Sequence, residues 1–207
     1  MKWETTDTKN IGLDFGFFNN KLTGAMNYYY NQTEELLITK ALPPSAGLNN
    51  PILNVGKIRN SGVEVEINWA DSKGGFDYNI GMNFSTTKNK VVELADKGQV
   101  LYGEGLKYGT EHFPTQTRVG KPIGAFYLYK TNGLFQSNEE ARQYVNADGD
   151  EYQPFADAGD IRYVDVNGDG YIDDDDKVYC GSGIPTLEVN LNFSAGYKGF
   201  DLSVVLG

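Results

Sequence analysis

Strict alternation of apolar and polar residues constrains the fold of this chain more than any other feature. It is clearest in "VEVEINWA", residues 63–70, where apolar side chains occupy odd positions and polar ones even positions. The same alternation recurs in 11–17, 76–84 and 187–195. A period of two places successive side chains on opposite faces of a β-strand, which excludes an amphipathic helix. The sequence therefore predicts strands with one apolar and one polar face.

Short turns join these strands into hairpins. We expect strands at about 10–18, 21–30, 61–70, 76–86, 186–197 and 199–207. The turns between paired strands contain the Asn, Asp or Gly that tight hairpins need, whereas the connections 31–60 and 87–185 are long. Short turns at one end and long loops at the other are typical of outer-membrane β-barrels. The predicted fold class is all-β, an antiparallel meander of hairpins.

The alternation leaves two folds open, because the apolar face could meet lipid in a transmembrane barrel or a second sheet in a soluble β-sandwich. The chain is 40 % hydrophobic and has no apolar run long enough for a membrane helix, so only a barrel could span. Aromatic residues near the strand ends suit the interfacial girdles of a barrel. They are Phe17, Phe18, Tyr28, Tyr29, Tyr30, Trp69, Phe84, Tyr197 and Phe200.

The acidic stretch "DVNGDGYIDDDD", residues 165–176, has the spacing of a calcium loop. Positions 1, 3, 5, 7, 9 and 12 are Asp165, Asn167, Asp169, Tyr171 through its carbonyl, Asp173 and Asp176. Gly170 at position 6 permits the sharp turn that such a loop needs. Position 12 is Asp instead of Glu, and the preceding segment is β-like, which disfavours a helical calcium sensor. We expect a structural Ca²⁺ site, with Asp160 as a possible extra ligand; the alternative is a solvated acidic turn without metal.

Few other residues suggest chemistry. The net charge of −10 argues against nucleic acid as a partner. His112 is the only histidine and belongs to no catalytic motif, so we expect no enzyme activity. The lone Cys180 permits no internal disulfide and is predicted to be a small buried side chain. Ser137 and Glu140 have capping-box spacing and predict a short helix.

Five blocks of sequence, in order, resemble the SusC-like (SusC/RagA family) TonB-dependent outer-membrane transporters. They are "NIGLDFGFFNNKLTGAMNYYYNQTEELL", "NVGKIRNSGVEVEINW", "GKPIGAFYLYKTNGLFQSNEEA", "GDIRYVDVNGDGYIDDDDKVYCGSGIP" and "LNFSAGYKGFDLSVVLG". The fourth block is the most specific, although it departs from the family's commoner "GNPNP" ending. The resemblance covers nearly the whole chain.

The resemblance implies a fragment from the C-terminal part of a barrel in the bacterial cell outer membrane. Family members are several times longer, with a signal peptide, a TonB-contact segment and a plug. Expected partners are a SusD-like surface lipoprotein, the TonB complex through the N-terminal region, a glycan or peptide substrate, and outer-membrane lipid. The alternative is a soluble calcium-stabilised β-sandwich that binds carbohydrate. Residues 87–185 are then expected to form a long extracellular loop region.

Two geometric expectations follow. A barrel would place six polar side chains on its concave, lumen-facing side: Glu64, Glu66, Asp77, Asn79, Glu188 and Asn190. Glu64 and Glu66 are therefore interpreted as part of a polar lining rather than as a glycosidase carboxylate pair. The segment 122–135 is expected to be partly extended, because Ala125, Tyr127 and Tyr129 alternate with two large apolar residues.

Overall fold

A computed structural model describes residues 3–39, 52–103, 106–108 and 110–207. The chain divides into two compact units. Unit 1 comprises residues 1–101, 117–123 and 184–207, and unit 2 comprises residues 102–116 and 124–183. No helix among the described residues has the length and apolar character needed to cross a membrane.

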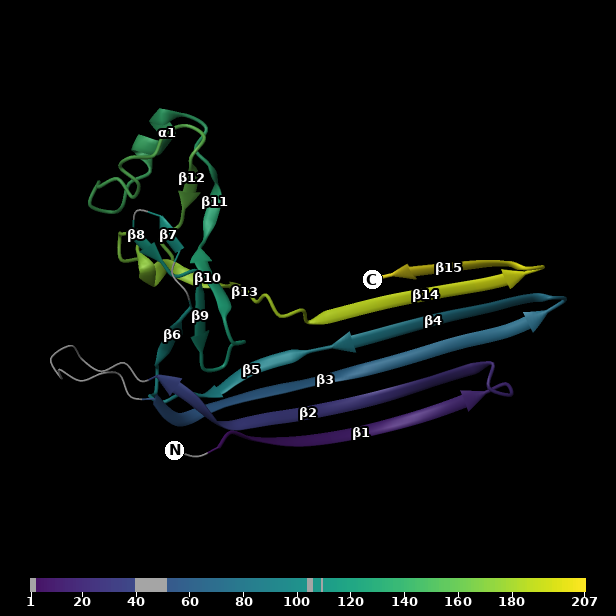
Figure 1. Cartoon of the computed structure of the whole chain (residues 1–207). Coiled ribbons are helices and arrows are strands. Elements are labelled where there is room, and N and C mark those ends of the chain that lie inside the picture. Colours follow the sequence, from purple (N-terminus) through teal and green to yellow (C-terminus); the bar gives the residue numbers. More distant parts are fainter. Residues whose placement is uncertain (1–2, 40–51, 104–105, 109) are drawn as a thin grey trace. The chain divides into compact units, whose positions relative to one another are not determined.

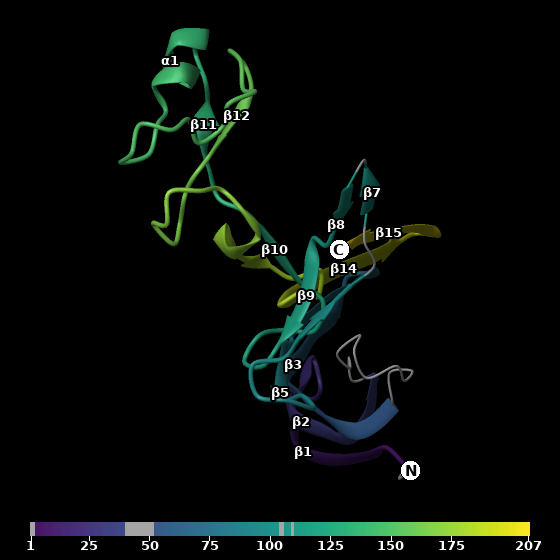
Figure 2. The same ribbon diagram turned by 90° about the vertical axis from the view of Figure 1, so that its left-hand side faces the viewer.

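Unit 1 is built on a seven-stranded antiparallel sheet (Figure 1). Its strands are β1 (Thr5–Phe17), β2 (Leu22–Thr39), β3 (Ile52–Lys73), β4 (Phe76–Thr86), β5 (Lys88–Glu93), β14 (Leu187–Tyr197) and β15 (Phe200–Leu206). The order is β1-β2-β3-β4-β14-β15, and β5 pairs with β3. Seen nearly end-on in Figure 2, these strands follow one another along a curve. The predicted all-β meander of antiparallel hairpins is confirmed.

The sheet extends into the segment 87–185, where the sequence predicts a loop region. Strand β5 continues the pairing of β4 with β3 in one register, since Ser85 lies opposite Glu64 and Lys88 opposite Ser61. The amide of Asn89 donates a hydrogen bond of 2.6 Å to Oδ1 of a β3 residue, Asn60. Residues 87–93 read "TKNKVVE" and lack apolar alternation, so their strand character is set by the partner strand.

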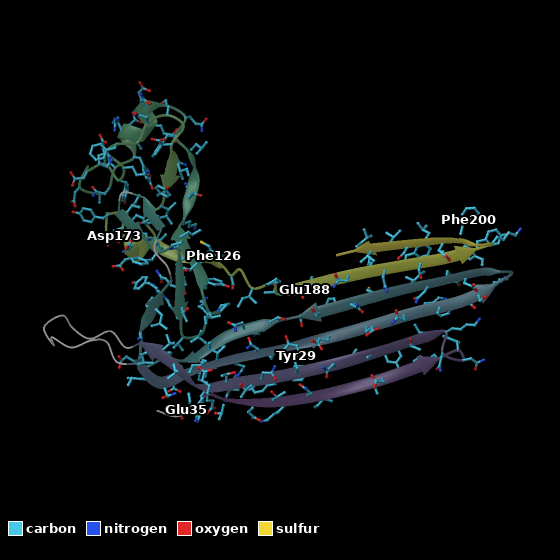
Figure 3. The ribbon with its side chains drawn as sticks, in the orientation of Figure 1. Tyr29, Glu35, Phe126, Asp173, Glu188 and Phe200 are labelled. Atoms are coloured by element: carbon cyan, nitrogen blue, oxygen red, sulfur yellow. The ribbon has the colours of Figure 1, made fainter. Side chains whose placement is uncertain are left out.

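A close approach of backbones at Gly62 tightens the middle of this sheet. The hydroxyl of Tyr29 lies over Gly62, donates to the carbonyl of Thr86 at 3.3 Å and lies 3.0 Å from Oγ1 of Thr87. Figure 3 labels Tyr29 within the sheet. A Cβ added at Gly62 would overlap the Thr86 carbonyl oxygen and the Tyr29 ring. Only glycine fits at this crossing.

Unit 2 contains the α-helix and most of the short strands that the structure describes, while β6 and β9 each have residues in both units. The strands from β6 onward are β6 (Val100–Tyr102), β7 (Leu106–Tyr108), β8 (Thr110–His112), β9 (Thr115–Arg118), β10 (Ala125–Tyr129), β11 (Thr131–Leu134), β12 (Ile161–Tyr163) and β13 (Lys177–Gly181). Strands β13, β10, β9 and β6 form one sheet in that order, and β11 pairs with β12. Ala125 and Tyr127 are buried while Phe126 and Leu128 are exposed, as the alternation predicts.

The helix α1 (Asn138–Gln143) begins where the capping-box spacing predicts. Oγ of Ser137 accepts a hydrogen bond from the backbone N–H of Glu140 at 3.2 Å. The carboxylate of Glu140 accepts from the N–H of Gln136 at 2.7 Å and pairs with Arg162 at 2.6 Å. The helix lies on a small core of Phe135, Ala141 and Ala156.

Candidate functional site

The strand register gives the unit 1 sheet two chemically distinct faces. Along one row, Asn27 lies opposite Glu64, Glu64 opposite Ser85, and Ser85 opposite Glu188. The adjacent row is Met26, Val65, Phe84 and Val189. We call these sides the polar face and the apolar face. By the same register, all six residues predicted to share a face lie on the polar face: Glu64, Glu66, Asp77, Asn79, Glu188 and Asn190.

The polar face is a hydrogen-bonded, acidic surface. Amides and hydroxyls donate to its carboxylates: Asn27 to Glu64 at 3.2 Å, Asn68 to Glu66 at 2.9 Å, and Ser85 to Glu188 at 3.4 Å. Between Gly62 and the hairpin turns, every charged residue described at a paired position of this face is acidic: Asp14, Glu64, Glu66, Asp77, Glu188 and Asp201. A depression of about 300 Å³ lies among Asn27, Glu64, Glu66, Asn83, Ser85 and Asn190. Such a surface repels anions and attracts cations.

The apolar face is exposed. Ile11, Leu13 and Leu202 are 76 %, 64 % and 56 % exposed. The seven long strands of unit 1 all belong to one sheet, and these side chains stay exposed on it. Large apolar patches of this kind mark contacts with a membrane or a partner.

Aromatic side chains gather at the end of the sheet where the hairpin turns lie. The rings of Phe18 and Trp69 are 6.1 Å apart, and those of Phe76 and Tyr197 are 6.3 Å apart. Nε1 of Trp69 donates to the Tyr78 hydroxyl at 3.3 Å. Figure 3 labels Phe200 at the β14–β15 turn and Glu188 at the opposite end of β14. This is the amphipathic girdle expected where a membrane meets water.

Asp176 is the anchor of the acidic loop in unit 2. It is fully buried, and its Oδ1 accepts hydrogen bonds from the N–H groups of Val166 at 2.7 Å and Asn167 at 3.3 Å. Its Oδ2 accepts from the N–H of Asp173 at 2.9 Å. Burial opposes ionisation, but these three donors together hold the pKa of Asp176 below its ordinary value.

The side chains of four other predicted ligands also turn toward the loop backbone. Asp165 accepts from the N–H groups of Gly168 at 2.6 Å and Gly170 at 2.9 Å, and from the Tyr152 hydroxyl at 3.3 Å. Asn167 and Asp169 each accept from the N–H two residues later, at 2.9 Å and 3.0 Å. Asp173 caps the 3₁₀ turn η2 (Asp174–Asp176) by accepting from the N–H of Asp175 at 2.8 Å. The bonds of Asn167, Asp169 and Asp173 are Asx turns, in which a side chain accepts from the backbone two residues later.

The described residues contain no group of three or more His, Cys, Asp or Glu side chains arranged to hold a metal ion. Asp160, suggested as an extra ligand, accepts a hydrogen bond from the N–H of Asp157 at 2.9 Å. The sequence spacing thus places side-chain oxygen atoms along the loop, and these oxygens accept hydrogen bonds from backbone N–H groups of the same loop. Calcium occupancy stays a prediction.

Tyr129 and Cys180 lie outside the predicted calcium ligands. The Tyr129 hydroxyl donates to Asp174 at 3.1 Å, and Lys177 pairs with Asp174 at 2.7 Å. Burial, followed by this hydrogen bond and nearby carboxylates, raises the pKa of Tyr129 to about 12. The prediction that Cys180 is buried is wrong: it is exposed on β13, which has an exposed face at this position. No sequence motif marks either residue.

Comparison with known proteins matches this architecture to one family. Residues 1–207 match the family described as TonB dependent receptor-like, beta-barrel. TonB-dependent receptor P3 of Formosa agariphila is 30 % identical over 205 residues, covering 99 % of this chain and 20 % of that protein. TonB-dependent receptor SusC of Bacteroides thetaiotaomicron is 27 % identical over 212 residues, covering 100 % of this chain and 19 % of that protein. The chain therefore spans about a fifth of the length of these curated relatives.

A solved structure has the same fold. The RagAB peptide importer in the "open-open" state aligns with a TM-score of 0.73 at 19 % identity, covering 99 % of this chain and 20 % of that one. The family match supports the outer-membrane barrel interpretation over the soluble sandwich, and the exposed apolar face agrees with it. The chain belongs to the TonB-dependent receptor β-barrel family of the outer membrane.

Proposed function

We propose that this chain forms part of the barrel wall of a TonB-dependent importer of glycans or other oligomeric nutrients such as peptides. The observation that carries the proposal is a single sheet with one exposed apolar face and one acidic, hydrogen-bonded face. A wall between lipid and a water-filled passage needs this combination, whereas a soluble sandwich would cover its apolar face. The polar face would line the passage, and its acidity would favour neutral or cationic substrates over anionic ones.

The test is uptake by the full-length transporter in its own bacterium. Cells that carry or lack its gene receive defined neutral oligosaccharides and oligopeptides, with and without a protonophore. Uptake of at least one compound should require both the gene and the energised inner membrane. Equal uptake by the two strains for every compound in the panel would contradict the proposal. A transport role without catalysis also predicts that the full-length protein does not cleave the compound that it imports.

The partners of the whole transporter are part of this proposal. A SusD-like surface lipoprotein would cover the extracellular side, and the TonB complex would act through N-terminal residues of the longer protein. Likeness to SusC supports this assignment. Affinity purification of the full-length protein from outer membranes should recover such a lipoprotein in equal amount.

We propose structural Ca²⁺ binding as a second role of the acidic loop, through Asp165, Asn167, Asp169, the Tyr171 carbonyl, Asp173 and Asp176. The calcium-type spacing supports it. The hydrogen bonds of Asp165 and Asp176 to backbone N–H groups support the competing account, a loop ordered without metal.

A chelator separates these two accounts. If Ca²⁺ orders the loop, EDTA should accelerate proteolysis within 165–176 of the full-length protein, and added Ca²⁺ should reverse the effect. Asp165→Ala with Asp169→Ala should abolish the response. If the chelator does not change the cleavage rate, the calcium proposal is contradicted and the loop is an acidic turn without metal.

A further inference from the structure

A group of basic side chains lies just beyond the last apolar row of the unit 1 sheet. That last row contains Ile11, Tyr28 and Val63. The next two rows on the same side are Lys9, Tyr30, Ser61 and Lys88, then Asp7, Gln32, Arg59 and Lys90. The register is unbroken through these rows, so the side chains share the apolar-face side. We call Lys9, Arg59, Lys88 and Lys90 the basic rim.

Among the described residues, the basic rim has more positive charges than paired carboxylates, since Lys9 alone has one. Arg59 and Lys90 are direct cross-strand partners, and like charges opposite each other destabilise a sheet. In the described part of the chain, no carboxylate lies within ion-pair distance of Arg59, Lys88 or Lys90. The neighbouring acids are otherwise engaged: Asp7 is 3.5 Å from Lys9, and Glu34 is 3.0 Å from Lys57.

The Arg59 guanidinium is positioned by an aromatic ring and one amide. Its Cζ lies 5.1 Å from the centre of the Tyr30 ring, and Nη2 donates to Oε1 of Gln32 at 3.1 Å. The Tyr30 hydroxyl donates to the same oxygen at 3.0 Å, and Lys9 approaches the ring at 5.9 Å. Nε of Arg59 is buried and has no hydrogen-bond partner among the described residues, so it is not presented to a ligand at the surface. The guanidinium is therefore oriented by Tyr30 and Gln32, and a ligand at the surface would have to bind through its Nη groups.

The basic rim lies at the height of lipid headgroups. The apolar rows run from that of Val63 on β3 to that of Phe76 on β4, which lies opposite Lys73; β3 itself has Asp71 and Lys73 in the last two rows. Ten residues at about 3.4 Å each, tilted by roughly 45°, rise about 24 Å. This matches the apolar band of outer-membrane barrels, about 25 Å tall. The rim begins one row beyond this band, at the end opposite the short hairpin turns. Short turns are periplasmic in such barrels, so the rim faces the extracellular leaflet.

We propose that the basic rim binds the phosphate groups of a phosphorylated lipid in the extracellular leaflet, whose acyl chains lie against Ile11 and Tyr28. The inference rests on the proposed barrel function. Arg59 offers the planar fork that matches phosphate oxygens, and Lys88 and Lys90 add point charges beside it. A phosphate between Arg59 and Lys90 relieves their mutual repulsion. Charge complementarity and the adjoining apolar rows together select a lipid phosphate over a soluble one.

The experiment titrates the full-length transporter in neutral detergent with diphosphoryl lipid A or with the same glycolipid lacking both phosphates, and counts bound lipid by native mass spectrometry. Arg59→Gln with Lys90→Gln should weaken binding of the phosphorylated lipid by about twenty-five-fold, because each basic residue near an anionic surface contributes roughly five-fold. Lys73→Gln, at the opposite end of β3 on the same side, is the matched control and should bind like wild type. The lipid without phosphates should bind weakly and equally to all three proteins.

The proposal is overturned if the wild-type protein binds the two lipids equally. It is also overturned if the double variant binds the phosphorylated lipid as tightly as the wild-type protein does. The electrophoretic mobility before and after heating shows whether the double variant folds. If it does not fold, the salt dependence of lipid binding by the wild-type protein tests the proposal instead. Binding of the phosphorylated lipid should fall as NaCl is raised, and salt-independent binding overturns the proposal. Substrate uptake is measured separately. Lipid selectivity without uptake would contradict the transport role alone, and uptake without lipid selectivity would contradict this inference alone.

Discussion

At the scale of single residues, Asp176 determines the order of the acidic loop. A fully buried carboxylate is costly unless its charge is compensated, and here three backbone N–H groups compensate it. The donors come from both ends of the segment, at Val166 and Asn167 and at Asp173. The carboxylate therefore joins the entry of the loop to its exit. Asp176 joins the two ends of the loop through backbone N–H groups alone, so no other carboxylate takes part in this role.

Replacing Asp176 with Asn should loosen the loop. One of the two oxygens becomes an NH₂ group that faces backbone donors, at a cost of about 1–3 kcal/mol. Hydrogen exchange at Val166, Asn167 and Asp173 in the full-length protein should accelerate by roughly ten-fold or more. Asp175→Asn is the control, because Asp175 is exposed and only its backbone N–H takes part in the cap. Equal exchange in the two variants would contradict the anchoring role.

Acid should loosen the same loop in wild type. The pKa of Asp176 is lowered in the folded protein, so its stabilising contribution is present above the ordinary value of 3.8. The contribution is lost as pH falls below 3.8 through the folded-state pKa. Protection of the Val166 N–H, the intrinsic exchange rate at each pH divided by the observed rate, should therefore fall over this acid range and stay constant between pH 5 and 7. The Asp176→Asn variant should lack this response to acid.

At the scale of elements, the hairpins are the part of the fold that the sequence predicts best. The alternation in 63–70 identifies a strand and its faces because both properties depend on the local period of two. Strand β5 is different: its residues lack the alternation, and its pairing with β3 supplies the order. The exposure of Cys180 and the buried position of Asp176 likewise depend on packing between distant segments, which spacing does not encode.

The Gly62 crossing should be intolerant of any side chain. Gly62→Ala forces the new Cβ into the Thr86 carbonyl oxygen, and overpacking of this kind costs about 1–3 kcal/mol. Gly12→Ala is the matched control in β1, since its nearest neighbour would be Asn27 Oδ1 at an ordinary 3.5 Å. The free energy of unfolding of the full-length protein in lipid vesicles, measured with denaturant, checks the difference. Equal stability of the two variants would show that the strands separate easily at this point.

At the scale of the whole molecule, two units of different character share one chain. Unit 1 is a sheet whose hydrogen bonds run between long strands, and unit 2 is a compact insertion with its own core of Phe135, Ala141 and Ala156. Each unit is compact by its own internal contacts. The sheet should therefore form without unit 2.

Replacement of residues 124–183 by a short Gly/Ser linker in the full-length transporter tests this independence. The pairs between β4 and β14 lie wholly within unit 1 and should persist. The shortened protein should reach the outer membrane and keep the slow electrophoretic shift on heating that folded barrels show. Uptake should fall if the insertion contacts a lid protein. Failure to assemble would contradict the independence of the sheet.

The pairing of Ser85 with Glu188, which are 103 residues apart, has a consequence for how such chains diversify. Closing a loop costs entropy that grows only with the logarithm of its length, about 0.6 kcal/mol for each doubling. Enlarging a five-residue turn to roughly a hundred residues takes about four doublings, so it costs about 2–3 kcal/mol. The eleven backbone pairings between β4 and β14 can offset that amount. Evolution can therefore exchange the segment between these strands almost freely, acquiring new loop surfaces while the sheet stays the same.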